Sequence, residues 1–352
     1  MNTDLCVAGI GACTSLGADL LSSAAAVRAG VTAFAEHPYM VDRSGEPMVV
    51  ARASYLDPDA PLAGRMAILG ERAALHACAQ ALGERFKRTA LSILVGLPFE
   101  VPGLAQIIAE DLRKALGSES VESVETVSAG HSSALLALEI AMERIGSGRA
   151  EWCLVGGVDS YMDAERLEHL DATGQLHSPS NSWGFIPGEG AGFCVITTVQ
   201  NALRWGTRPL GRLVSASSAR EVNLIRTDSV CLGAGLSRAI RDAISALSSG
   251  ARVDTVVCDM NGDAYRADEY GFSIARMGER FHDATEVTTP ADSWGDVGAA
   301  SGILLLGLAI TAARKGYAKG PHALVWTSSD TGERAAALLQ TVMEEESGGS
   351  WG

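Results

Sequence analysis

The ten residues Trp183-Gly-Phe-Ile-Pro-Gly-Glu-Gly-Ala-Gly192 carry the most distinctive pattern in this sequence. Four glycines and one glutamate run directly into the apolar segment 192–197, which we expect to be a buried strand. Some glycine-rich segments bind phosphate, but those lead into a helix N-terminus, and no helix is expected here. The glycines are therefore interpreted as allowing a tight turn and close backbone packing, and Glu189 as a buried structural acid.

Strand and helix patterns alternate on both sides of this segment. In the first half, strands are expected at 5–10, 91–95, 121–127 and 152–158, and helices at 17–28, 63–81, 103–116 and 134–145. In the second half, strands are expected at 210–218, 253–258 and 322–327, and helices at 233–248, 265–277 and 302–314. This alternation predicts an α/β protein, and the weak likeness between the halves suggests a duplication near residue 205.

Composition excludes several classes of protein. The 352 residues are 47% hydrophobic, and the formal net charge of −14 comes with no block of Lys or Arg, which argues against a nucleic-acid surface. The seven cysteines have no CxxC or metal-ligand spacing, so we expect small buried hydrophobes in a reducing compartment. No apolar run reaches 18 residues and no signal peptide is visible. We therefore expect a cytoplasmic protein with no membrane contact and no cofactor.

Four segments resemble the β-ketoacyl synthase family, and they occur in the family's order. They are residues 7–17, residues 132–141 followed by 149–160, residues 183–192, and residues 295–302. The resemblance implies a thiolase fold, in which two duplicated βαβαβαββ halves form a layered αβαβα arrangement. The halves would be residues 1–205 and 206–343, followed by a disordered tail at 344–352. It also implies a homodimer built partly through the strand before the nucleophile.

The resemblance further implies that the family's chemistry has been replaced. His131 falls at the position of the family's nucleophilic Cys, while Asp259 and Asp296 fall at the positions of its two histidines. Ala291 lies near the family's lysine, and residues 328–334 replace its glycine-rich gatekeeper loop. Because an imidazole is a poor acyl carrier and two carboxylates repel a malonyl group, decarboxylative condensation is not expected. The leading hypothesis is a pseudoenzyme that acts as a partner or adaptor subunit.

A competing hypothesis uses Ser132. Residues 130–134 (Gly-His-Ser-Ser-Ala) resemble the nucleophile elbow of serine hydrolases, so Ser132 could serve an acyltransferase or thioester hydrolase. Alternatively, Ser132 or Ser133 caps the following helix, a common role for serine, and this interpretation is preferred.

Two further alternatives concern binding. His131, Asp259 and Asp296 could hold a divalent metal or make a His–Asp pair. The preferred interpretation is a hydrogen-bonded polar plug in a retired site. An acyl carrier protein, being acidic, would need a basic patch on this acidic chain. Candidate residues are Arg144, Arg149, Arg204, Arg208 and Arg212.

Overall fold

The computed structural model describes residues 4–99 and 101–341. Within these residues, ten strands form one continuous sheet in the order β10-β9-β11-β12-β8-β1-β7-β6-β4-β5. The strands of the first half are β1 (Leu5–Thr14), β4 (Leu91–Leu97), β5 (Val121–Ser128), β6 (Cys153–Ser160) and β7 (Glu189–Thr198). Those of the second half are β8 (Gly211–Arg220), β9 (Thr255–Cys258), β10 (Val287–Thr288), β11 (His322–Ser328) and β12 (Glu333–Thr341).

The two halves of the sheet have the same topology. The order β5-β4-β6-β7-β1 in the first half matches β10-β9-β11-β12-β8 in the second. In each half, the first three strands in this order pair in parallel, and the remaining two pairings are antiparallel. The halves join where Leu5–Val7 of β1 pairs with residues 211–213 of β8. The predicted α/β thiolase fold is confirmed, while the exact boundary at residue 205 stays a prediction.

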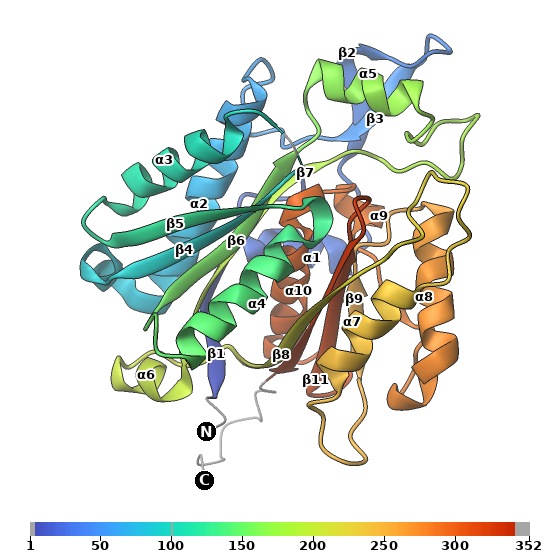
Figure 1. Ribbon diagram of the computed structural model, residues 1–352. Coiled ribbons are helices and arrows are strands. Elements are labelled where there is room, and N and C mark those ends of the chain that lie inside the picture. The colour runs from blue at the N-terminus through green and yellow to red at the C-terminus, as the bar shows by residue number, and fades with distance from the viewer. Residues whose placement is uncertain (1–3, 100, 342–352) are drawn as a thin grey trace.

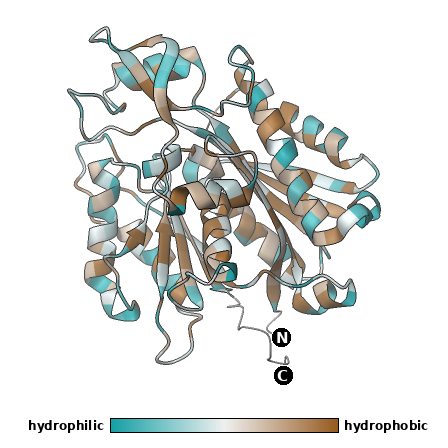
Figure 2. Cartoon of the chain, turned by 180° about the vertical axis from the view of Figure 1, so that it is seen from behind, coloured by the Kyte–Doolittle hydropathy of each residue, from teal (hydrophilic) through white to brown (hydrophobic). Residues whose placement is uncertain are grey.

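Helices cover both sheet faces and fill the space between the halves (Figure 1). The outer helices are α2 (Leu62–Leu82) and α3 (Leu104–Leu116) on one side, and α7 (Ala234–Ile244) and α8 (Ala264–Met277) on the other. The two central helices are α4 (Ser133–Gly146) and α10 (Ser301–Arg314). The residues of α10 are almost all buried, as expected for a helix enclosed on all sides. Figure 2 shows apolar residues concentrated in the strands and the central helices, and polar residues on the outer helix faces.

A small cap lies at the end of the molecule where the central helices begin (Figure 1). It consists of the hairpin β2 (Phe34–Val41) and β3 (Pro47–Ala51) together with α5 (Ala164–Ala172). These elements share a separate apolar cluster that includes Tyr161 and Phe185. None of the cap elements was expected from sequence, nor was strand β12.

The remaining helices are short, and they complete the connections between the layers. They are α1 (Leu20–Arg28), α6 (Val199–Arg204) and α9 (Ala291–Trp294). In the described part of the chain, no helix is both long and apolar enough to cross a membrane. The tail expected to be disordered, 344–352, lies outside the described residues.

Candidate functional site

A tight turn between β5 and α4 presents the first predicted site residue. After β5 ends at Ser128, Gly130 adopts a left-handed backbone conformation with φ of 67°, which favours glycine because it has no Cβ. A single 3-10 turn over Gly130–Ser132 follows and leads into α4. The turn places His131 at the N-terminal end of this central helix, where its side chain is 8% exposed.

Asp296 is brought to His131 from the opposite half of the chain. The Nε2 atom of His131 lies 2.9 Å from both carboxylate oxygens of Asp296. The glycine-rich segment 183–192 fixes the backbone of Asp296, because the Asp296 N–H donates to Ile186 O at 2.7 Å and Gly188 N–H donates to Asp296 O at 2.7 Å. The most distinctive sequence motif therefore positions a site residue, and Glu189 itself is fully buried in a two-bond pair with Arg65.

The His131–Asp296 pair is charged. Burial opposes ionisation of both groups, but the carboxylate of Asp296 outweighs it at His131 and raises the pKa of the imidazole above its ordinary value. In turn, His131, Arg266 and the amide of Asn261 hold the pKa of Asp296 well below its usual range, against the effect of burial. Gly298 N–H and the Tyr161 hydroxyl also donate to Asp296. The raised pKa favours the imidazolium form of His131, in which Nε2–H donates to the carboxylate of Asp296.

Asp259 lies near this pair but turns toward a different partner. Its Oδ2 accepts hydrogen bonds from Arg266 Nη1 and from Ser328 N–H, both at 2.9 Å. Its Oδ1 is buried and has no hydrogen-bond partner within the described residues. Burial raises the pKa of Asp259 above its ordinary value, although the positive charges of Arg266 and His131 oppose the rise. Arg266 is thus the side chain that connects Asp259 to the site.

Ser132 faces away from the cavity and into the protein. Its side chain is fully buried, and its hydroxyl donates to the backbone carbonyl of Thr327 or of Glu333, at 3.1 and 3.0 Å. Ser132 occupies the predicted N-cap position of α4 but makes no side-chain capping hydrogen bond. The hydroxyl of Ser133 donates to the carbonyl of Gly130 and does not cap the helix either. No imidazole of the described residues hydrogen bonds to Ser132, so a general base for a serine nucleophile is missing there.

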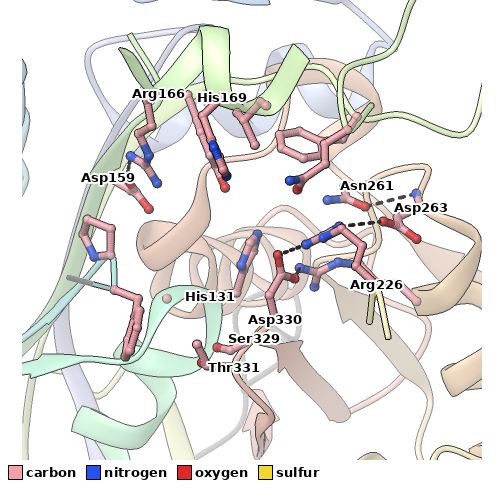
Figure 3. A pocket seen from close by; sticks show the side chains of 18 residues that line it. His131, Asp159, Arg166, His169, Arg226, Asn261, Asp263, Ser329, Asp330 and Thr331 are labelled. Atoms are coloured by element: carbon pink, nitrogen blue, oxygen red, sulfur yellow. Dashed lines mark hydrogen bonds and ion pairs between the residues drawn. The ribbon is translucent and has the colours of Figure 1, made fainter. Parts of the chain in front are cut away.

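A cavity of about 350 Å³ opens above His131 (Figure 3). Its charged lining residues alternate in sign, and they are Asp159, Arg166, Arg226, Asp263, Arg266 and Asp330. Arg226 bridges Asp263 and Asp330, and it is the one non-glycine residue with positive φ (57°) in the described part of the chain. A lining of this kind suits a polar ligand better than a long acyl chain.

The structure does not bring the predicted residues together as a metal site. Within residues 4–99 and 101–341, no group of three or more His, Cys, Asp or Glu side chains is arranged to hold a metal ion. Sequence reasoning missed Arg266, Tyr161 and Asn261, which contact the predicted acids Asp259 and Asp296. It also missed Arg166 and its partner Asp159. A signal was available only for Asn261, which directly follows the Asp259-Met260 pair in the matched segment.

Comparisons with known proteins agree with this architecture. Residues 101–202 match the family model of the β-ketoacyl synthase N-terminal domain. A stretch of 118 residues is 30% identical to the polyketide synthase GfsA of Streptomyces halstedii, but it covers 32% of this chain and only 2% of that much longer protein.

Solved structures with the same fold are ketosynthases. The OzmH KS7 ketosynthase domain of Streptomyces albus JA3453 is 16% identical with a TM-score of 0.79, covering 97% of this chain and 76% of its own. The ishigamide ketosynthase/chain length factor is 17% identical with a TM-score of 0.81, covering 97% and 100%. The type II complex AntDE:AntF, a ketosynthase with its acyl carrier protein, is 16% identical with a TM-score of 0.80. The match covers 97% of this chain and 100% of that chain. This chain therefore has the ketosynthase (thiolase) fold, and its residues 101–202 match the β-ketoacyl synthase N-terminal domain.

Proposed function

We propose that this chain is a ketosynthase-like protein that does not carry out decarboxylative condensation and acts as a partner or adaptor subunit. One observation carries the proposal: the residue at the family's nucleophile position, His131, is held in a buried ion pair with Asp296. An imidazolium has protons on both ring nitrogens, so it has no lone pair with which to attack a thioester.

The cysteines support the same conclusion. All seven lie in the described part of the chain, and all are buried as free thiols. Burial raises the pKa of each, to about 12 for Cys6, Cys13, Cys78 and Cys153. A nucleophilic cysteine needs the opposite shift, which a helix N-terminus or a nearby cation provides. No native thiol is therefore suited to accept an acyl group.

The test of this proposal is a search for covalent and condensed products. The protein is incubated with an acyl thioester and a malonyl thioester, and intact-mass spectrometry follows adducts while chromatography follows β-ketoacyl product. We expect neither. The variant H131C is the matched control, because it places a thiol on the wall of the cavity, where iodoacetamide should alkylate it faster than the native cysteines, none of which lines the cavity. An acyl adduct on His131 of the native protein, or any condensed product, would overturn the proposal.

The edge strand β5 is the proposed contact with a second subunit. It ends the ten-stranded sheet in the order observed, and its eight residues are mostly exposed or half-buried. An edge strand of this length offers unpaired N–H and C=O groups to another strand. A ketosynthase paired with a chain length factor, and a ketosynthase bound to its carrier protein, occur among the proteins of this fold. We propose a homodimer, or pairing with a catalytic subunit, through β5.

Two adjacent proline variants test this contact. In a strand with one neighbour, successive N–H groups point alternately toward the neighbour and toward the open edge. Of E125P and T126P, one should therefore lower thermal stability by breaking a bond to β4, and the other should leave stability nearly unchanged. The second variant should weaken association, as measured by analytical ultracentrifugation. A dimer that survives both substitutions would rule out pairing through β5.

The basic patch proposed for a carrier protein is weakened by local pairing. Arg144 pairs with Glu125, Arg149 with Glu143, and Arg212 with Asp4. Because these arginines are neutralised by neighbours on this chain, an acidic partner gains little from them. The serine-dependent acyltransferase is likewise disfavoured by the burial of Ser132.

A further inference from the structure

We propose that the cavity above His131 is a binding site for a short-chain carboxylate, which would accept hydrogen bonds from His131 and Arg166. The proposal deepens the proposed function of this site, because it rests on the view that the cavity no longer handles acyl transfer. The ligand would bind beside His131, at the position of the family's nucleophile.

One ring nitrogen of His131 has no partner on the protein. Nε2 is fully engaged with Asp296, whereas Nδ1 has no hydrogen-bond partner in the described part of the chain. The ring lines the cavity and projects into it, facing Arg166 and His169 (Figure 3). A side chain that is 8% exposed and still has an unsatisfied donor needs an acceptor. The acceptor must come from the contents of the cavity.

The carboxylates that line the cavity already accept hydrogen bonds from groups of the protein. Asp159 accepts at both oxygens, from Arg166 Nη1 and Ser160 N–H on Oδ1 and from Ala299 N–H on Oδ2. Asp263 and Asp330 likewise accept at both oxygens, and Arg226 contributes to each. Unsatisfied side-chain donors therefore face the cavity, while each oxygen of these carboxylates already accepts at least one hydrogen bond. A ligand that fits this pattern supplies oxygens, which a carboxylate does.

Arg166 is the second donor. Its Nη1 donates to Asp159 at 2.7 Å and to Ser160 O, and its guanidinium lies 4.2 Å from the ring centroid of Tyr161. These contacts hold the side chain in place, while Nε and Nη2 have no hydrogen-bond partner within residues 4–99 and 101–341. An arginine with a free, fixed edge is suited to carboxylate binding.

The size and the remaining walls define the rest of the ligand. The cavity, about 350 Å³ in volume, has room for a short-chain carboxylate. Leu170 and Phe185, both buried, and the exposed Phe99 contribute apolar surface to its lining. A short aliphatic chain would contact this apolar surface while its carboxylate pairs with His131 and Arg166.

Binding should depend on pH through His131. The charged groups that act on its ring are Asp296, which precedes α10, Asp259, which follows β9, and Arg266 of α8. Arg166 and His169 of α5 face the ring across the cavity. Tyr161, which follows β6, contacts Asp296 rather than the ring. Because the pKa of His131 is raised above 6.5, the imidazolium form persists to higher pH than in an unperturbed histidine, and affinity should fall as the pH rises through the raised value.

The experiment is calorimetric titration of the full chain with butyrate, with butyramide as the uncharged analogue. We expect butyrate to bind, butyramide to bind at least about tenfold more weakly, and H131Q and R166Q each to weaken butyrate by about tenfold or more. R314Q, at the exposed C-terminal end of α10, is the matched control and should bind normally. R166Q leaves the buried ion pair intact, so it remains informative if H131Q folds poorly.

Three results would overturn the inference: no butyrate binding, equal binding of butyramide, or unchanged affinity in both H131Q and R166Q. In addition, the affinity of the native protein should decline as the pH rises above 6.5 through the raised pKa of His131, and in H131Q this decline should disappear. A failure here would leave the non-condensing proposal intact, because that proposal is judged by acyl adducts and condensed product. An acyl adduct on His131 would overturn that proposal whatever butyrate does.

Discussion

The ion pair between His131 and Asp296 is the feature on which the site depends. Both side chains are buried, and both are held charged by each other against the cost of burial. A buried pair of this kind contributes little net stability over a well-packed apolar pair, but removing one partner leaves an uncompensated charge.

Asp296→Asn should therefore be strongly destabilising. The amide cannot balance the imidazolium, so the pKa of His131 should fall and the free energy of unfolding should drop by about 3–5 kcal/mol. Urea unfolding measures the change, and NMR titration of the His131 ring measures the pKa. The exposed pair Lys87–Glu84 is the matched control, because E84Q should change stability by less than about 1 kcal/mol. A His131 pKa that stays high in D296N would contradict this account.

The pH dependence of stability follows from the same two groups. Asp296 has a lowered pKa, so its contribution is present above its ordinary value of 3.8 and is lost as the pH falls through the lowered value. His131 has a raised pKa, so its contribution is present below 6.5 and is lost as the pH rises through the raised value. We compare the free energy of unfolding of the native chain with that of the H131Q/D296N double variant. The excess stability of the native chain should be largest between pH 3.8 and pH 6.5. Urea titrations across pH measure it, and a difference that is flat with pH would argue against a charged pair.

Ser132→Ala tests whether this residue is structural. Loss of the hydroxyl removes the donor to the carbonyls of Thr327 and Glu333, so stability should fall by about 1–3 kcal/mol. Ser147→Ala, on the exposed end of α4, is the control and should change stability by less than about 0.5 kcal/mol. Thermal unfolding compares the two. If S132A abolished an acyl adduct seen with the native protein, the serine-nucleophile hypothesis would return.

At the scale of elements, close contacts between strand and turn hold the site together. Gly157 of β6 packs so tightly against the turn before α10 that an added Cβ would lie 2.1 Å from Ala299 O. The contact involves backbone, which cannot move aside as a side chain can. This turn also carries the N–H groups that bind Asp159 and Asp296.

Gly157→Ala should consequently displace the turn and destabilise the protein by about 1–3 kcal/mol. It should also weaken butyrate binding if the further inference is correct, since the turn supports Asp296. Gly146→Ala at the end of α4 is the control, because its Cβ would meet nothing within 4 Å. Chemical denaturation should show G146A to be neutral or slightly stabilising. Equal stability of the two variants would contradict the packing argument.

For the whole molecule, the halves share one core. Residues from both, such as Leu135 of α4, Leu304 of α10 and Val325 of β11, belong to the same buried cluster. The sheet is also continuous through β1 and β8. Neither half would bury its central helix alone, so the duplication does not create two independent folding units.

Unfolding should accordingly occur in one cooperative transition. Calorimetry of the full chain should give a single peak, and the fragments 1–205 and 206–343 expressed separately should show no cooperative unfolding. Mixing the fragments should restore some folded protein if α4 and α10 can pack again. Two separate calorimetric transitions would show that the halves are thermodynamically independent.

The sequence by itself determined the α/β class, the order of most elements and the fold family. Apolar periodicity and glycine-rich turns report burial directly, so the strand near residues 192–197 and the helix near 134–145 could be predicted. It also identified His131, Asp259 and Asp296 as the positions of interest through resemblance alone.

Only the tertiary structure decided how those residues interact. Strand β12, rich in alanine and leucine, has a helix-forming composition that pairing with β8 and β11 overrides. Ser132 turned out to face the β11–β12 connection, and Arg166 and Arg266 joined the site from elements whose contacts no local pattern reveals. The physical reason is that local sequence sets backbone preference and burial, whereas the partner of a buried charge depends on long-range packing between the halves. His131 and Asp296, for example, are 165 residues apart in sequence.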